Sequence, residues 1–129
     1  MNFDRNVLDE LTQRAKESPR LRMNLDLRNS PEDGSQRMLN ALEPGTVLPI
    51  HRHRNSSETV AILRGRAVQW LYDDEGNVVE TVLLEVGGDI PAMNVKKGQW
   101  HRLESLESGT VIVEFKDGAY EPVGAEDMM

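Results

Sequence analysis

The chain contains no cysteine and only three histidines, at positions 51, 53 and 101, among its 129 residues. Without cysteine the protein has no disulfide, no cysteine-ligated zinc or iron–sulfur centre and no thiol nucleophile. Any imidazole chemistry therefore has to use His51, His53 or His101. Basic residues are also scarce, since 15 Lys and Arg face 22 Asp and Glu and the net charge is −7. This acidity argues against nucleic-acid partners and against adhesion to anionic membrane surfaces.

Long apolar runs are absent as well, because none approaches the roughly 18–20 residues of a membrane-spanning helix. The N-terminal stretch MNFDRNVLDELTQ carries acids where a signal peptide needs a basic start and an apolar segment. Together with the absence of cysteine, these features predict a cytoplasmic protein with no membrane partner. The length of 129 residues is typical of a single domain.

The spacing of apolar residues changes once along the chain. Over residues 6–17 it is helical, with Asn6 as the expected cap and Ser18-Pro19 as the end. After Pro19 the apolar residues alternate, and turn residues recur every 8–12 positions, which is typical of a β-sandwich or barrel. The expected strands are 20–28, 36–43, 47–53, 58–64, 67–72, 78–86, 90–95, 100–106 and 110–115.

The three histidines and one glutamate form a metal-ligand pattern. His51 and His53 share one face of an expected strand, and a four-residue turn leads from them to Glu58. His101 comes from a much later strand, directly after a turn at Gly98. Three imidazoles and one carboxylate suit a single divalent metal ion such as Fe(II), Mn, Ni or Zn, with positions left open for water or substrate.

The glycines around these residues extend the pattern to a known motif. Gly45 and Gly65 complete G-x5-H-x-H-x4-E-x6-G, which resembles the first motif of the cupin superfamily. Gly98-Gln99-Trp100-His101 resembles part of the second motif, with Lys96 in place of its proline and Ser105 in place of its asparagine. Within that superfamily, residues 7–120 resemble the WbuC-type cupin-fold metalloproteins. The segments that carry this second resemblance are 18–22, 36–54, 63–66, 98–101, 106–110 and 114–120.

The resemblance implies an all-β fold, a cupin-type double-stranded β-helix or jelly-roll barrel with one N-terminal α-helix. Residues 1–35 would pack a helix and a strand on the barrel, 36–120 would form the barrel, and 121–129 an irregular tail. The resemblance also implies a homodimer and a link to bacterial surface-polysaccharide gene clusters, while the activity of the family is not settled.

Alternation along the strands predicts what surrounds the metal. Val60 and Ile62 would form an apolar floor below Glu58, Val47 and Pro49 would share the face of the two paired histidines, and Leu103 that of His101. Arg52 and Arg54 would point away from the metal.

Six further residues are candidates for binding a substrate. Arg20, Arg22 and Asn24 share one face of the first strand and would clamp a phosphate or carboxylate if that face looks into the barrel; the alternative is a solvated outer face. Arg37 and Asn40 are similar candidates with less support, since alternation places them on opposite faces of their strand. Trp100 would stack on a sugar, or simply pack.

The function that fits best is a metal-binding cupin for a small oxygen-rich molecule, a sugar or sugar-nucleotide derivative, with isomerase- or epimerase-like activity. The alternatives are an oxygen-dependent dioxygenase and a non-catalytic binding or sensing module. With all three histidines assigned to the metal, a general base would have to be a carboxylate, a lysine, a tyrosine or metal-bound water.

Overall fold

The computed structural model of the protein describes all residues from 1 to 129 and has one α-helix, eight strands and one short 3-10 helix. Neither helical segment has the length and apolar character needed to cross a membrane. The elements are α1 (Arg5–Glu17), β1 (Arg22–Asp26), β2 (Ser35–Leu42), β3 (Glu58–Arg64), β4 (Arg66–Tyr72), β5 (Val78–Glu85), β6 (Ala92–Val95), β7 (Trp100–Ser105), β8 (Thr110–Asp117) and η1 (Ala125–Asp127).

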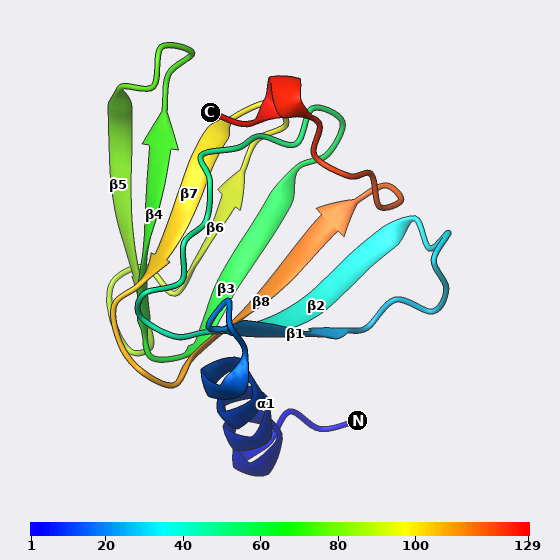
Figure 1. The fold of residues 1–129 in the computed structure, drawn as a ribbon, viewed down its shortest axis with the longest axis vertical. Helices are drawn as coiled ribbons and strands as arrows, with labels where there is room; N and C mark the ends of the chain where they lie inside the picture. Colours follow the sequence, from blue (N-terminus) through cyan, green and yellow to red (C-terminus); the bar gives the residue numbers. More distant parts are fainter.

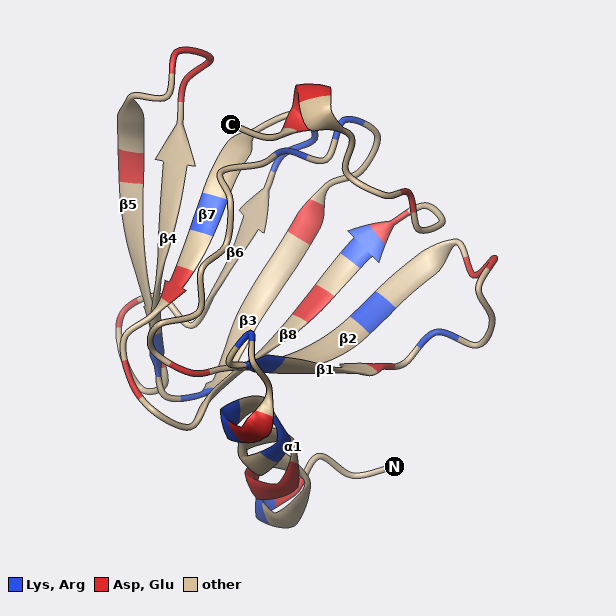
Figure 2. Cartoon of the chain, viewed as in Figure 1, with Lys and Arg blue, Asp and Glu red and all other residues tan.

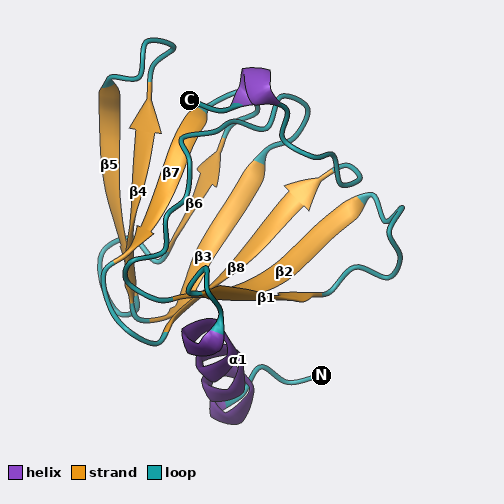
Figure 3. Ribbon diagram, in the orientation of Figure 1, coloured by secondary structure: helices purple, strands orange, loops and turns teal.

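Two antiparallel sheets face each other in a jelly-roll sandwich (Figures 1 and 3). The alternating pattern predicted a sandwich or barrel, and the cupin resemblance implied the jelly roll. The larger sheet has the strand order β1-β2-β8-β3-β6 and the smaller one β5-β4-β7. Strands distant in sequence, such as β2 and β8, are therefore neighbours. α1 lies at one end of the molecule and η1 at the other (Figure 1).

Helix α1 begins at Arg5, one residue earlier than the sequence indicates. Asp4, not Asn6, is its N-cap, and its carboxylate accepts a hydrogen bond of 3.0 Å from the Val7 amide. Asn6 was a plausible cap by residue type, but an acidic cap in front of it satisfies the free amides of the first turn equally well. The buried side of the helix presents Leu11 and Ala15 to the larger sheet.

The larger sheet separates two kinds of environment, because side chains alternate along each strand. Its outer face carries Leu39, Ala41, Val111 and Val113, which form one core with α1. Its inner face contributes to a second core between the sheets. That core consists of Leu42, Val60, Ile62, Ala67, Val82, Leu84, Leu103 and Ile112.

The segment from 43 to 57 differs most from the sequence prediction. The strand expected at 47–53 is a loop with two isolated β-bridges, both at His51, to His101 and to Met128. In the first bridge the His51 amide donates to the His101 carbonyl at 3.1 Å and the His101 amide donates back at 2.8 Å. The Gly98 amide donates to the carbonyl of His53 at 2.9 Å. The two histidines are thus attached to β7, and not to β3 through a hairpin ladder.

Gly65, the last position of the first motif, is required by its backbone. Its φ of +82° lies in the left-handed region, where side chains are unfavourable. A Cβ at this position would also lie 2.8 Å from the Thr110 Cα atom. The glycine therefore permits the tight β3–β4 connection to pass β8.

Candidate metal centre

The three histidines and Glu58 meet at one end of the space between the sheets. Glu58 is the first residue of β3, His101 is the second residue of β7, and His51 and His53 come from the loop that bridges to β7. The imidazole ring centroids are 4.4–5.5 Å apart. Oε2 of Glu58 lies 3.2 Å from Nε2 of His53 and 3.3 Å from Nε2 of His101. The structure thus brings together the four residues that the motif singles out.

Backbone carbonyls hold two of the rings in one tautomer. Nδ1 of His51 lies 3.0 Å from the Pro49 carbonyl and Nδ1 of His101 lies 2.8 Å from the Gln99 carbonyl. Because a carbonyl only accepts, both Nδ1 atoms are donors, and in the neutral rings the Nε2 atoms carry free lone pairs. This is the usual support of a histidine that ligates a metal through its other nitrogen.

The Nε2 atoms of His53 and His101 are buried and make no hydrogen bond. A buried polar atom without a partner is costly, so such atoms point to a missing ligand. The ligating atoms of the three histidines lie within 4.8 Å of one another. The histidine triad can therefore hold a metal ion, and its donors fit the chemistry of a divalent first-row metal.

The charges within the cluster are strongly coupled. Burial raises the pKa of the Glu58 carboxyl, but His101 and His53 beside it outweigh this effect and hold that pKa well below its ordinary value. Burial lowers the pKa of His51 to about 4, with His101 acting in the same direction. Burial also lowers the pKa of His101, but the Glu58 carboxylate outweighs it and the net shift is upward. Neutral His51 and ionised Glu58 are the forms that bind a metal.

A cavity of about 130 Å³ adjoins the cluster. Val60 and Ile62 are buried below Glu58 in the inner core, as the alternation predicts, and Leu103 lines the cavity wall. The prediction for Val47 is wrong, because its side chain is 82% exposed. The segment that contains it is a loop, so the alternation of a strand does not apply.

Besides the histidines and Glu58, four polar side chains line the same cavity. The sequence analysis did not identify three of them, Gln69, Glu114 and Lys116, as site residues. Glu114 and Lys116 lie on the inner face of β8, and Gln69 on β4 faces them from the smaller sheet. Asn40 on β2 completes the group. Alternation along β8 could have predicted them, because Glu114 and Lys116 lie two and four residues after the inward-facing Ile112 and therefore face the same side. Burial raises the pKa of Glu114 to about 7, and the nearby Glu58 charge adds to this effect.

A larger chamber of about 410 Å³ lies next to this cavity. His53 and Lys116 line both spaces. Segment 117–127 forms much of the chamber wall, which contains few apolar side chains. A polar ligand that reaches the histidine cluster would therefore extend under the C-terminal segment.

The C-terminal segment is fastened to the histidine loop by Asp127. Its Oδ1 atom accepts from Nε of Arg52 and from Nη2 of Arg54, both at 2.8 Å. The Arg52 amide donates to the Asp127 carbonyl at 3.0 Å, and the Met129 amide donates to the Ile50 carbonyl at 2.8 Å. Arg52 and Arg54 thus use their charges on this segment. Nothing in the residues of the tail signals such a contact.

Three of the predicted substrate residues lie at the start of the chain. Arg22 and Asn24 are on the inner face of β1, since they pair with Leu42 and Asn40 of β2. The Arg22 guanidinium donates to the Val47 carbonyl at 3.1 Å, and Arg20 is exposed in the preceding turn. None of the three lines the 130 Å³ cavity.

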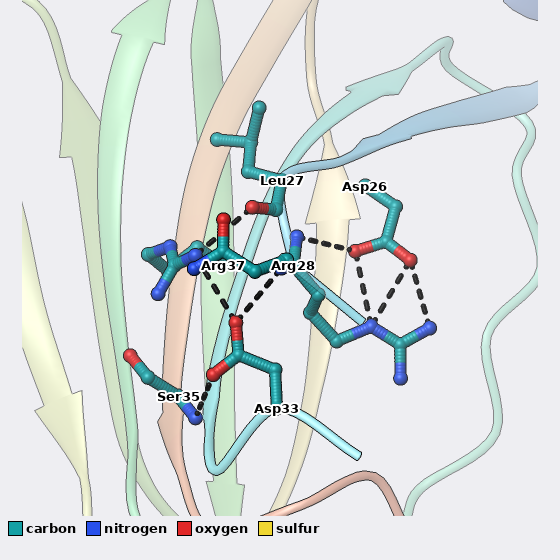
Figure 4. A network of polar contacts seen from close by, with 7 residues as sticks. Asp26, Leu27, Arg28, Asp33, Ser35 and Arg37 are labelled. Carbon is teal, nitrogen blue, oxygen red and sulfur yellow. Dashed lines mark hydrogen bonds and ion pairs between the residues drawn. The ribbon is translucent and has the colours of Figure 1, made fainter. Parts of the chain in front are cut away.

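The structure does not bring Arg37 and Trp100 to the cavity either. Arg37 lies on the outer face of β2 and donates to the Leu27 carbonyl at 3.0 Å and to Asp33 at 3.2 Å (Figure 4).

Trp100 points away from the His101 side of β7. Its indole donates to Asp74 at 3.1 Å, and the Arg52 guanidinium lies 4.5 Å from the ring centroid. Both side chains are engaged in contacts within the chain.

Charged residues are distributed in keeping with this picture. Charged bands lie on β3 and β8 (Figure 2). The inward-facing charges of these strands are those of Glu58, the first residue of β3, and of Glu114 and Lys116 in the second half of β8. The lower parts of the same strands carry the apolar inner core. The space between the two sheets is therefore apolar at one end and polar at the end that carries the site.

Solved structures with this arrangement are cupin-fold proteins. Recombinant oxalate oxidase in complex with glycolate has a TM-score of 0.66 at 15% identity, over 83% of this chain and 56% of its own. A cupin 2 domain-containing protein from Halorhodospira halophila has a TM-score of 0.60 at 16% identity, over 80% and 68% of the two chains. The capsular polysaccharide assembling protein CapF from Staphylococcus aureus has a TM-score of 0.60 at 19% identity, over 77% and 27%. At these identities the likeness shows the cupin fold.

The chain thus spans little more than half of the oxalate oxidase chain. No curated protein sequence matches it. A family model described as a domain of unknown function matches residues 3–84, a stretch that includes His51, His53 and Glu58 and ends before His101. The chain has the cupin fold and belongs to this family, the domain of unknown function DUF6016.

Proposed function

We propose that the protein is a metal-dependent cupin of the WbuC type, in which His51, His53, Glu58 and His101 bind one divalent metal ion. The metal is Fe, Mn, Ni or Zn, all of which accept this donor set. The ion positions a small oxygen-rich molecule, a sugar or sugar-nucleotide derivative used in surface-polysaccharide metabolism. The similarity to CapF, a capsular polysaccharide assembling protein, supports that choice of ligand.

One observation carries the metal assignment. Two buried imidazole Nε2 atoms, those of His53 and His101, lie within 3.3 Å of the same Glu58 oxygen and have no hydrogen-bond partner. A cation between them would satisfy both lone pairs and the carboxylate together. Imidazoles that served only structure would have hydrogen-bond partners for both nitrogens.

The bound metal would act as a Lewis acid toward an oxygen of the ligand. The protein contributes the orientation of the site, because the Pro49 and Gln99 carbonyls fix two of the rings. The apolar floor at Val60 and Ile62 excludes water from below and strengthens electrostatic interactions in the cavity.

Glu114 favours an isomerase or epimerase over a binding module. It is the one carboxylate besides Glu58 in the 130 Å³ cavity. A general base is what a binding module lacks. An isomerisation needs no external oxidant, since the proton that Glu114 removes from one carbon returns to the substrate at another carbon or at the opposite face.

The metal assignment is tested by the metal content of the purified protein. We expect close to one equivalent of a first-row metal in the wild type, and loss of the metal in a variant with His51→Ala and His53→Ala. A matched control is Arg102→Ala, because Arg102 follows His101 on β7 without lining the cavity.

Circular dichroism and thermal unfolding would show whether the variants keep their fold. Stoichiometric metal in the folded double variant would contradict the proposed site. Retained metal together with no exchange of substrate protons in either the wild type or Glu114→Gln would favour the non-catalytic binding module.

A further inference from the structure

A buried amide without a partner lines the cavity. Gln69 is 2% exposed, and its side-chain amide makes no hydrogen bond in the structure. Its position on β4, opposite Leu103 of β7, directs it to the inner side of the smaller sheet. An amide N–H requires an acceptor atom, and a metal cation cannot provide one. The amide therefore indicates an oxygen-bearing ligand beyond the metal.

Lys116 supplies a positive charge beside the same space. It is half-buried on the inner face of β8, where it pairs with Glu58 in the sheet register. Although two carboxylates, Glu58 and Glu114, lie near it, Lys116 forms no ion pair within 4.0 Å. Lys116 lines both the 130 Å³ cavity and the 410 Å³ chamber, so it lies where the two spaces adjoin.

The two donors and the remaining polar residues describe the ligand. An ammonium group and an amide N–H both call for acceptor oxygens, and the ammonium group favours an anionic one. The Glu114 carboxylate and the side-chain amide oxygen of Asn40 can accept hydrogen bonds from hydroxyl groups. Acceptor oxygens with a negative charge at one end and hydroxyl groups at the other are the features of a hydroxycarboxylate.

We propose that the cavity binds a small polyhydroxylated carboxylate, with its carboxylate group on Lys116 and a ligand oxygen accepting from the Gln69 amide. The inference deepens the proposed function and rests on it for the metal. It specifies that the oxygen-rich ligand of the proposed function carries a carboxylate group. The polar wall of the larger chamber accommodates the hydroxylated part.

The test compares two probes that differ only in the anionic group. Isothermal titration calorimetry would measure the binding of D-gluconate and of D-glucitol to the metal-loaded protein. We expect gluconate to bind at least tenfold more tightly than glucitol, because only gluconate carries a carboxylate for Lys116.

Variants assign the effect to the two side chains. Lys116→Gln should lower gluconate affinity at least tenfold and bring it close to that of glucitol, while Lys116→Arg should keep the preference. Gln69→Leu should weaken both probes. Lys97→Gln, which removes an exposed lysine from the turn before β7, is the matched control and should leave both affinities unchanged.

Nuclear magnetic resonance gives a readout apart from affinity. The side-chain NH2 signal of Gln69, assigned by its loss in Gln69→Leu, should shift on addition of gluconate. Equal affinities for the two probes, no gluconate binding up to 10 mM, or an unchanged gluconate affinity in folded Lys116→Gln would each overturn the proposal.

The metal content of each sample separates this proposal from the preceding one. A wild type that holds metal but does not distinguish the probes would overturn the carboxylate site alone. A wild type without metal would contradict the proposed function, and its preference between gluconate and glucitol would still decide the role of Lys116.

Discussion

The two terminal segments each cover one end of the sandwich, and they do so by different means. At one end, α1 packs Leu11 and Ala15 against the outer face of the larger sheet. At the other end, segment 117–127 lines the polar chamber and is held by the contacts of Asp127 with Arg52 and Arg54. One cover is apolar and buried, and the other is polar and beside the site.

Because of this difference, we expect α1 to contribute mainly to stability and the C-terminal segment to contribute mainly to the geometry of the site. Burial of apolar surface contributes mainly to the free energy of folding. Polar contacts at a partly exposed surface contribute little to stability, but they can fix the position of the groups they hold. Arg52 and Arg54 flank His53 in the chain, so the C-terminal cover should act on the candidate metal centre.

The largest effect is expected at the apolar cover. Leu11→Ala removes a side chain that is 4% exposed, so the free energy of unfolding should fall by about 2–5 kcal/mol. Urea denaturation of the metal-free protein would measure this change. The metal content of the folded variant should stay that of the wild type. Glu10→Ala, at an exposed position of the same helix, should change stability by less than about 0.5 kcal/mol. A loss of metal in folded Leu11→Ala would remove the distinction between the two covers.

A smaller effect, of the opposite kind, is expected at the polar cover. Asp127→Asn weakens both arginine contacts, so the histidine loop should be held less firmly and metal affinity should fall by about tenfold. Competition with a chelator would measure the affinity. Glu126→Gln changes a neighbouring carboxylate that forms no ion pair, and it should leave the affinity unchanged. Equal metal affinity in Asp127→Asn and the wild type would show that the segment does not position the loop.

The smallest effect is a pH dependence of the polar cover. Arg54 and Arg52 lower the pKa of Asp127 below its ordinary value of 3.8. A lowered carboxyl pKa contributes stability that is present above pH 3.8 and is lost as the pH falls through the folded-state pKa. The melting temperature of the wild type should therefore exceed that of Asp127→Asn at pH 6, and the difference should disappear at a pH well below 3.8. A difference that persists at that pH would mean that the carboxylate charge is not what holds the segment.

The regular part of the fold was predictable because its strands alternate cleanly. A β-sandwich or barrel, the N-terminal helix and the inner positions of Val60, Ile62 and Leu103 follow from periods of two and 3.6 residues. The jelly-roll topology was implied by the cupin resemblance. The cupin motif placed His51, His53, Glu58 and His101 in one cluster. Their role as metal ligands stays a prediction.

The irregular part was not predictable from periodicity. The loop that carries His51 and His53 has the residue pattern of a strand, but it is held by one bridge to His101 and by the C-terminal segment. Arg37 lies on the outer face of β2 by the regular alternation, but its hydrogen bond to Asp33 in the preceding loop has no periodic signal. Glu114 and Lys116 were within reach of the alternation argument, whereas Asp127 lies 73 residues from Arg54 with no local signal.

The central claim, that four named side chains share one metal ion, is tested most directly by a crystal structure with anomalous diffraction recorded at the absorption edge of the metal found in the protein. We expect a single anomalous peak about 2.0–2.2 Å from an imidazole nitrogen of each of His51, His53 and His101, and from a carboxylate oxygen of Glu58. An anomalous peak away from these four residues, in protein that carries stoichiometric metal, would contradict the proposed metal site.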